Sequence, residues 1–415
     1  MEKEKTALRR DAETIIRAAL EAVLPDCAVE EALRGHRFGS GRLYLVAIGK
    51  AAWQMANRAC EVLGERIADG VVVTKYGHAK GDLPRVRVFE AGHPVPDENS
   101  YRATRAAVEL VHDLKPADTV LLLISGGGSA LFEQPLIPTD EMRSVTEQLL
   151  ACGADIREIN TIRKRFSAVK GGRFAQLCAP AQVFAVVLSD IIGDPLDMIA
   201  SGPAWPDAST CAQALSITER YHISLSGEAR ALLSRETPKT LDNVETRITG
   251  SVRQLCAAAE KSARSLGYEP IVLTASLRCE AREAGSFLAS IAEQYQNAGR
   301  SMAFIAGGET VVHLRGRGLG GRNQELALSA ARFLDGMKET ALFSVGSDGT
   351  DGPTDAAGGY VDGETAAALR EKGVDPEEAL EQNDSYHALG ACGGLIMTGA
   401  TGTNVNDLTA LLIRR

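Results

Sequence analysis

The stretch that most constrains the fold is an apolar run that breaks into three glycines. Residues 119–124 read Thr-Val-Leu-Leu-Leu-Ile, and they are followed directly by Ser125, Gly126, Gly127, Gly128 and Ser129. A run without polar alternation predicts a parallel strand covered on both faces, and such strands present ligand loops at their carboxyl ends. Glycines let several backbone N–H groups converge on a phosphate. The loop is a candidate phosphate cradle, and a strand-to-helix turn that binds nothing is the alternative.

The composition favours an α/β enzyme. The 415 residues are 45% hydrophobic, 24% charged and 5% aromatic, with 41 glycines, which is more typical of an α/β fold than of a β-sandwich. The formal net charge of -9 argues against general nucleic-acid binding, because nucleic-acid binders concentrate positive charge. We therefore expect no nucleic-acid partner, and local cations around any small anionic ligand.

The sequence also predicts a cytoplasmic protein without a membrane partner. The first residues mix acids with bases, unlike a signal peptide, and no run reaches the roughly 18 apolar residues of a membrane span. The eight cysteines are scattered without a Cys-x-x-Cys pair, which is typical of reduced thiols. Spacing does not set the oligomeric state, and we expect a monomer or a homodimer.

Strand and helix patterns alternate in two blocks along the chain. This alternation predicts two three-layer α/β/α domains with largely parallel sheets, the first of them Rossmann-like. Residues 209–244 show no strand pattern, so we place the first domain at residues 1–235 and the second at residues 236–415.

Two cations stand at predicted helix starts. Lys50 follows the apolar run 43–48, where the positive end of a helix favours anions, although a solvated lysine is the alternative. Arg322 lies in the glycine-rich stretch 315–325 and can offer a bidentate fork to a phosphate or carboxylate. His93, in a proline-containing loop, is more typical of a structural histidine than of a catalytic one.

Five further cations gather between two predicted elements. They are Arg163, Lys164, Arg165, Lys170 and Arg173. Such a cluster in an acidic chain either lines an anionic substrate cleft or forms an exposed helix face whose long side chains reach solvent. The sequence leaves both interpretations open.

Three aspartates are candidate magnesium ligands. Asp190 follows the apolar run 182–188 by two residues. Such a position suits Mg²⁺, because this ion binds one or two carboxylates beside water and phosphate oxygens. Asp348 and Asp351 lie in a loop rich in Asp and Gly that lacks the ligand order of an EF-hand. Each aspartate can instead be a turn former.

Seven motifs occur in order along nearly the whole chain. They are Ala47-Ile-Gly-Lys-Ala51, Gly92-His-Pro-Val-Pro-Asp97, Ser125-Gly-Gly-Gly-Ser-Ala-Leu131, Leu188-Ser-Asp190 with Ser201-Gly-Pro203, Gly320-Gly-Arg-Asn-Gln-Glu325, Gly346-Ser-Asp-Gly-Thr-Asp-Gly-Pro-Thr354 and Thr401-Gly-Thr-Asn-Val-Asn-Asp407. Together they resemble the class II glycerate kinases, the glycerate 2-kinases whose C-terminal part is called the MOFRL domain. The resemblance places the MOFRL region at residues 300–410.

This resemblance implies ATP- and Mg²⁺-dependent phosphorylation of D-glycerate at its 2-hydroxyl, in a cleft between the two domains. It assigns catalysis to Lys50 and Arg322, the nucleotide phosphates to residues 125–129, and Mg²⁺ to Asp190, with Asp348 and Asp351 as weaker candidates. Which cation meets the substrate carboxylate stays open, as does phosphorylation at the 2- rather than the 3-hydroxyl.

Two other functions remain possible. Residues 316–321 match Gly-x-Gly-x-x-Gly between an expected hairpin at residues 311–314 and a helix, which would suit an NAD(P)-dependent hydroxypyruvate reductase. A lone match of this kind is weak, and the nearby arginines suit phosphate or carboxylate better. A non-catalytic anion-binding protein would bind the same ligands without turnover.

Overall fold

The computed structural model describes residues 6–415 and divides them into two compact units. The N-terminal unit consists of Ala28–Ser189 and Asp194–Thr249. The C-terminal unit consists of Asp190–Gly193, Gly250–Arg415 and the described residues up to Cys27.

The N-terminal unit is built around a sheet with the strand order β3-β2-β1-β4-β5-β6. Its strands are β1 (Leu43–Ile48), β2 (Ile67–Lys75), β3 (Val86–Ala91), β4 (Thr119–Ile124), β5 (Gln182–Leu188) and β6 (Val244–Gly250). Its helices are α2 (Pro25–Arg34), α3 (Ala52–Leu63), η1 (Gly64–Arg66), α4 (Glu98–Leu110), α5 (Gly128–Leu131), α6 (Thr139–Ala151), α7 (Ile156–Arg165), α8 (Arg173–Cys178), η2 (Ile199–Ser201), α9 (Cys211–Arg220) and α10 (Gly227–Leu233). From β3 to β5, neighbouring strands run parallel.

Strand β1 explains why apolar runs form the centre of this sheet. Leu43, Leu45 and Ala47 pack into one cluster with α2 and α3, while Val46 and Ile48 on the other face are also fully buried. A strand covered on both faces cannot alternate apolar with polar residues, which is the pattern the sequence shows.

The C-terminal unit contains a second sheet with the strand order β11-β10-β9-β12-β8-β7. Its strands are β7 (Glu269–Leu277), β8 (Met302–Gly308), β9 (Thr340–Gly346), β10 (Gly358–Asp362), β11 (Leu395–Ile396) and β12 (Asp407–Ile413). Its helices are α1 (Ala7–Ala22), α11 (Val252–Ser265), α12 (Ala281–Tyr295), α13 (Arg322–Leu334), α14 (Thr365–Glu371), α15 (Pro376–Glu381) and α16 (Ser385–Cys392).

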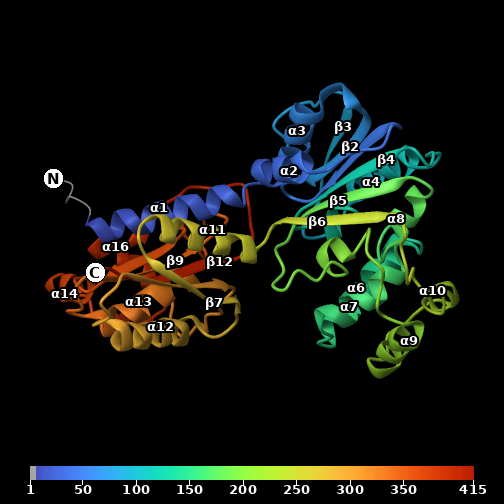
Figure 1. Cartoon of the computed structure of the whole chain (residues 1–415). Coiled ribbons are helices and arrows are strands. Elements are labelled where there is room, and N and C mark those ends of the chain that lie inside the picture. The colour runs from blue at the N-terminus through green and yellow to red at the C-terminus, as the bar shows by residue number, and fades with distance from the viewer. Residues whose placement is uncertain (1–5) are drawn as a thin grey trace. The chain divides into compact units, whose positions relative to one another are not determined.

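Helices cover both faces of this second sheet, as Figure 1 shows. On one face, α1 and α11 pack against alternate strand residues such as Ile305 and Phe343. On the other face, α12 and α13 pack against Phe304 and Leu342. The predicted α/β class, with two layers of helices around each sheet, is confirmed.

Three features depart from the expected organisation. Helix α1 packs on α11 of the C-terminal unit, because its pattern shows that one face is buried but not against which partner. Strand β6, expected to open the second domain, instead neighbours β5 in the first sheet, so the chain leaves the N-terminal unit at Thr249 and not at residue 235. The second sheet is mixed: β7 and β8 pair in parallel, whereas β12 runs antiparallel to β8 and β9, and β10 runs antiparallel to β9 and β11.

The described residues also bear on membrane-spanning helices and on disulfides. No helix among residues 6–415 is long and apolar enough to cross a membrane. In the same range no disulfide joins any of the cysteines.

Candidate anion-binding site

The glycine loop after β4 is tied to the end of the neighbouring strand β1. The Lys50 N–H donates to the Gly126 carbonyl at 2.9 Å, and the Ala51 N–H donates to Ser125 Oγ at 3.1 Å. Gly127 has a φ of 85°, in the left-handed region that glycine tolerates best, and α5 begins at the next residue. The parallel pairing of β1 with β4 thus places Lys50 beside the loop.

The loop presents a row of unused hydrogen-bond donors. Within residues 6–415, the backbone N–H groups of Gly126, Gly127, Gly128 and Ser129 donate to no protein acceptor. Three of these residues are partly exposed, so an incoming anion can reach the row. Consecutive N–H groups around a left-handed glycine form a concave anion-binding nest. This arrangement is what a phosphate requires.

Two side chains flank Gly127. A Cβ built on Gly127 would lie 3.0 Å from the His93 ring and 3.2 Å from Lys50 Cγ. Among the described residues Lys50 has no carboxylate partner, whereas its carbonyl oxygen accepts from Thr74 and faces the His78 ring. Burial, followed by the charge of Lys50, lowers the pKa of His93 below its ordinary value. The site therefore combines an unpaired ammonium with an imidazole that stays neutral at pH 7.

A second, strained segment packs against the same loop. Ser129 Oγ lies 2.9 Å from Ser201 Oγ, which donates to the Asn160 side chain at 3.3 Å. Ala200 and Ser201 have φ values of 50° and 60°, a conformation that costs non-glycine residues energy and that is frequent at functional sites. A Cβ on Gly128 would lie 2.7 Å from the Ala200 Cβ, so only glycine fits there.

The cluster of five cations has neither of the two expected fates. Lys164, Arg165 and Lys170 are buried and paired with carboxylates. Arg163 donates to the Ser129 carbonyl of the glycine loop at 3.4 Å. Arg173 donates to carbonyls at the end of α7, including that of Ser167.

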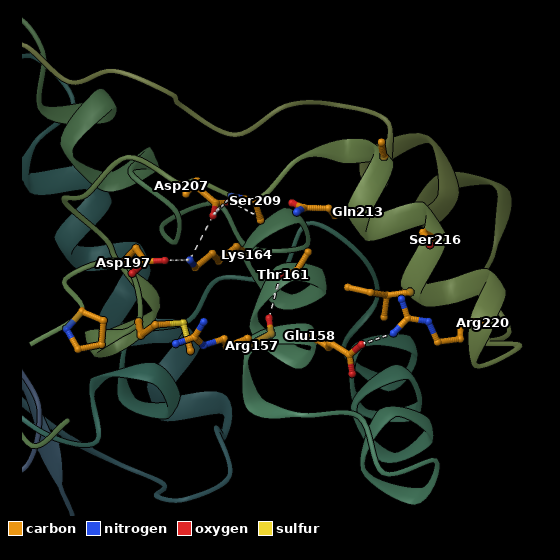
Figure 2. A pocket seen from close by; sticks show the side chains of 15 residues that line it. Arg157, Glu158, Thr161, Lys164, Asp197, Asp207, Ser209, Gln213, Ser216 and Arg220 are labelled. Carbon is orange, nitrogen blue, oxygen red and sulfur yellow. Dashed lines mark hydrogen bonds and ion pairs between the residues drawn. The ribbon is translucent and has the colours of Figure 1, made fainter. Parts of the chain in front are cut away.

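Lys164 closes one side of a surface groove of about 710 Å³ between α7 and α9. Figure 2 shows its ammonium between Asp197 and Asp207, at 3.3 and 3.2 Å. The groove also contains the Arg220–Glu158 pair, and its three cations are matched by three acids. Its charge is balanced, so it is less suited to an anion than the glycine loop.

In the C-terminal unit, Arg322 is held by acids. Its fork donates to both carboxylate oxygens of Asp407, at 2.6 and 3.0 Å, and its third nitrogen lies 3.3 Å from Glu309. Burial by itself lowers the pKa of Arg322, but the hydrogen bonds and charge of Asp407 raise it above its ordinary value. The expected fork is therefore already engaged, although about a third of the side chain stays exposed.

The start of α13 also carries its own anion. The two oxygens of Asp351 accept the N–H groups of Asn323 and Gln324, at 3.1 and 2.9 Å. Burial raises the pKa of Asp351 to about 6, despite these hydrogen bonds. The helix end expected to bind a ligand anion is thus capped by a side chain of the protein itself.

The glycines before α13 are packed against the chain. The N–H groups of Arg315 and Gly316 donate to Asn383 Oδ1, and that of Leu319 donates to Asp384 Oδ1. A Cβ on Gly316 would lie 2.3 Å from the Gln382 backbone. No strand covers residues 311–314, so the expected hairpin is wrong. This stretch lacks the adjoining strand of a dinucleotide turn, and the N–H groups of Gly316, Gly318 and Leu319 are already bonded within the chain.

The three aspartates predicted as metal ligands do not form a cluster. Among the described residues no group of three or more His, Cys, Asp or Glu side chains is arranged to hold a metal ion. Asp348 accepts from the Thr350 N–H in its own turn, and the Asp190 carbonyl accepts from Asn406 at 3.3 Å. Mg²⁺ needs only one or two protein carboxylates, so the magnesium assignment stays a prediction.

Several residues around these sites were not singled out from the sequence. Glu309 pairs with Arg322 and accepts a hydrogen bond from Asn406, and Ser201 with Asn160 supports the glycine loop. Glu309 follows two glycines at the end of β8, which is the same signal that marked Ser125. Asn406 lies in the motif at residues 401–407, but that motif did not mark its side chain individually.

The fold and the loop define a class. A lysine and a row of free N–H groups at the carboxyl ends of parallel strands are the arrangement by which α/β enzymes that act on nucleotides hold phosphate. Comparison with known families then narrows this class. Residues 11–234 match a domain of unknown function (DUF4147), and residues 302–407 match the MOFRL family.

Relatives extend over nearly the whole chain. A D-glycerate 2-kinase of Thermotoga maritima is 53% identical over 413 residues, covering 98% of this chain and 99% of that protein. The crystal structure of a Thermotoga maritima glycerate kinase superposes with a TM-score of 0.94 over 98% of this chain and 99% of its own. A putative hydroxypyruvate reductase of Agrobacterium vitis is 40% identical over 389 residues, covering 90% of this chain and 87% of that protein. The chain belongs to the class II glycerate kinase family.

Proposed function

We propose that this protein is a glycerate 2-kinase, which transfers the γ-phosphoryl group of ATP to the 2-hydroxyl of D-glycerate. The observation that carries the proposal is the row of four unpaired N–H groups at residues 126–129 next to the unpaired Lys50. The name of the relative that is 53% identical over its full length supports the same activity.

In the proposed reaction, a bond forms between the 2-hydroxyl oxygen and the γ-phosphorus, while the bond from that phosphorus to the ADP oxygen breaks. Phosphoryl transfer depends mainly on positioning and on neutralisation of charge. The N–H groups of the loop would hold phosphate oxygens, and Lys50 would neutralise charge on them. The hydroxyl proton needs an acceptor, and the neutral imidazole of His93 beside Lys50 is suited to accept it.

Magnesium would neutralise and orient phosphate oxygens of the nucleotide. The donor chemistry near Asp190 fits this ion, since Mg²⁺ prefers oxygen ligands and the buried Asn406 Oδ1 has no partner within residues 6–415. We assign the ion to Asp190. Asp348 and Asp351 remain weaker candidates, because their oxygens accept hydrogen bonds from nearby backbone N–H groups.

Arg322 would act in the same reaction on an anionic group of a substrate. Its hydrogen bonds to Asp407 fix the plane of the guanidinium group, and the exposed part of that group can still bind a carboxylate or phosphate. The proposal also places the enzyme in the cytoplasm, which cell fractionation would test. It gives the enzyme as a monomer or homodimer, which light scattering would test.

The reductase alternative has less structural support. Its motif, residues 316–321, follows no adjoining strand, and the N–H groups of Gly316, Gly318 and Leu319 are already bonded within the chain. Because one relative is named as a putative hydroxypyruvate reductase, the assays below also test for reductase activity.

The test is a pair of assays on the purified protein. One measures ADP release with D-glycerate, ATP and Mg²⁺, and the other measures NAD(P)H oxidation with hydroxypyruvate. We expect glycerate-dependent ADP release that falls by about a hundredfold or more in Lys50→Ala and Arg322→Ala. The exposed Lys115, replaced by alanine, is the matched control and should keep full activity.

Phosphorus NMR of the product decides between 2- and 3-phosphoglycerate. Oxidation of NAD(P)H without ADP release would refute the kinase. Ligand binding without either reaction would support the non-catalytic alternative.

A further inference from the structure

A buried ion pair lies directly behind the glycine loop. Lys170 is fully buried, and its Nζ lies 2.8 Å from an oxygen of Glu133, which is 1% exposed. The same Nζ donates to the Phe132 carbonyl at 2.9 Å. Phe132 is the C-cap of α5, the short helix that starts within the loop at Gly128. The ammonium thus contacts the residue that follows this helix.

The residues after Lys170 hold the strained segment. The Gly171 N–H donates to the Ser201 carbonyl at 3.0 Å, and the Gly172 N–H donates to the Gly202 carbonyl at 2.7 Å. Ser201 Oγ in turn lies 2.9 Å from Ser129 Oγ. The contacts form a closed circuit that runs from the loop through Phe132, Lys170 and Ser201 back to the loop.

A buried ion pair by itself contributes little to the stability of the folded state. The cost of removing two charges from water often equals or exceeds their attraction, and apolar pairs of similar volume are frequently as stable. Here burial lowers the pKa of Lys170 to about 8, although the charge of Glu133 acts in the opposite direction. The facing charges are Glu133 and Arg163, the latter 3.8 Å from Glu133. What the pair provides instead is orientation, because the Lys170 ammonium holds the Glu133 carboxylate and the Phe132 carbonyl in fixed positions at the same time.

We propose that Lys170, paired with Glu133, is a positioning residue that holds the N–H groups of residues 126–129 in their converging, phosphate-ready geometry. It acts through the Phe132 carbonyl on one side and the Ser201 segment on the other. The inference rests on the proposed kinase activity for its kinetic consequence, but its structural consequence is measured without any substrate.

The main test replaces both charges by apolar groups, in Lys170→Met/Glu133→Leu, so that no charge is left buried alone. We expect a melting temperature near that of the wild type, together with faster hydrogen exchange at the N–H groups of Ala130, Leu131 and Phe132, which bond within the loop. The KM for ATP should rise about tenfold and the KM for D-glycerate should change little. A wild-type exchange pattern and an unchanged KM for ATP in this variant would overturn the proposal.

Two further variants keep the test decisive. Glu133→Gln leaves Lys170 in place to donate to the Phe132 carbonyl, and it should shift the same exchange rates in the same direction by a smaller factor. No shift would count against the proposal. Arg282→Met/Glu325→Leu removes a comparable pair in the C-terminal unit, where Arg282 also contacts the Leu380 carbonyl. Exchange at residues 130–132 should stay unchanged in it, and an equal shift would contradict the inference.

The two proposals fail separately. Absence of glycerate-dependent turnover in the wild type would remove the kinase, whereas the exchange rates would still decide whether Lys170 positions the loop.

Discussion

Lys50 differs from the other cations near the glycine loop because no carboxylate of the described residues neutralises it. Lys164 and Lys170 are each bound to acids and withdrawn from solvent. An ammonium next to free N–H groups concentrates positive charge at one place and attracts anions, so its presence favours an anion site. The sequence placed Lys50 at a helix start, but the absence of a partner is visible only in three dimensions.

The first prediction at the residue scale concerns His93 and pH. Its pKa lies below the ordinary value of 6.5, so the unfolded chain takes up a proton before the folded one as the pH falls. The stabilising contribution of neutral His93 is complete above pH 6.5 and is lost as the pH falls through the folded-state pKa. Urea unfolding at pH 7.5 and 5.5 should show a larger loss for the wild type than for His93→Gln. Equal losses would show that the environment of His93 does not matter.

At the scale of elements, the two glycine-rich stretches have opposite roles. The loop after β4 leaves the N–H groups of residues 126–129 free, while Gly316 and Leu319 bond theirs to Asn383 and Asp384, and Gly316 packs against the chain backbone. The sequence made both candidates for ligand binding, since glycine serves close approach to a ligand and close approach to the chain equally well. The partners of the second stretch lie 65 or more residues away, so local pattern did not reveal them.

The second prediction compares two left-handed glycines. Gly127 and Gly153 have φ values of 85° and 77°, so alanine should cost about 1 kcal/mol of unfolding free energy at either position. Nothing lies within 4 Å of a Cβ on Gly153, whereas one on Gly127 meets His93 and Lys50. Gly127→Ala should therefore lose most glycerate-dependent ADP release and Gly153→Ala should not. Matching kinetics in the two variants would argue against a role for the loop.

At the scale of the whole molecule, the path of the chain departs from the expected two consecutive domains. The described residues up to 27 belong to the C-terminal unit, residues 28–189 do not, residues 190–193 again belong to it, and the chain returns to it at residue 250. Helix α1 buries Leu8, Ile15, Ile16 and Leu20 in the core beside α11. Its amphipathic pattern was plain in the sequence, but every amphipathic helix leaves the identity of its partner undetermined.

The third prediction follows from this path. Ile15 is fully buried against the second sheet, so Ile15→Ala should lower the unfolding free energy of the C-terminal unit by about 2–5 kcal/mol. Hydrogen exchange should quicken in β8 and β12 of that unit, although residue 15 is near the start of the chain. Leu121→Ala, in β4, is the matched control and should quicken exchange in β1 and β4 instead. Faster exchange in β1 after Ile15→Ala would contradict the assignment of α1.

The sequence by itself determined the α/β class, the buried parallel strands and the positions where loops follow them, because these depend on residues that are neighbours along the chain. It also showed the family resemblance, which the comparisons confirm. Only the tertiary structure decided which donors are free, that Asp407 and Asp351 occupy Arg322 and the start of α13, and where α1 and β6 belong. These features depend on partners far away in the chain, and charge or hydrophobicity at one position does not specify the partner that satisfies it.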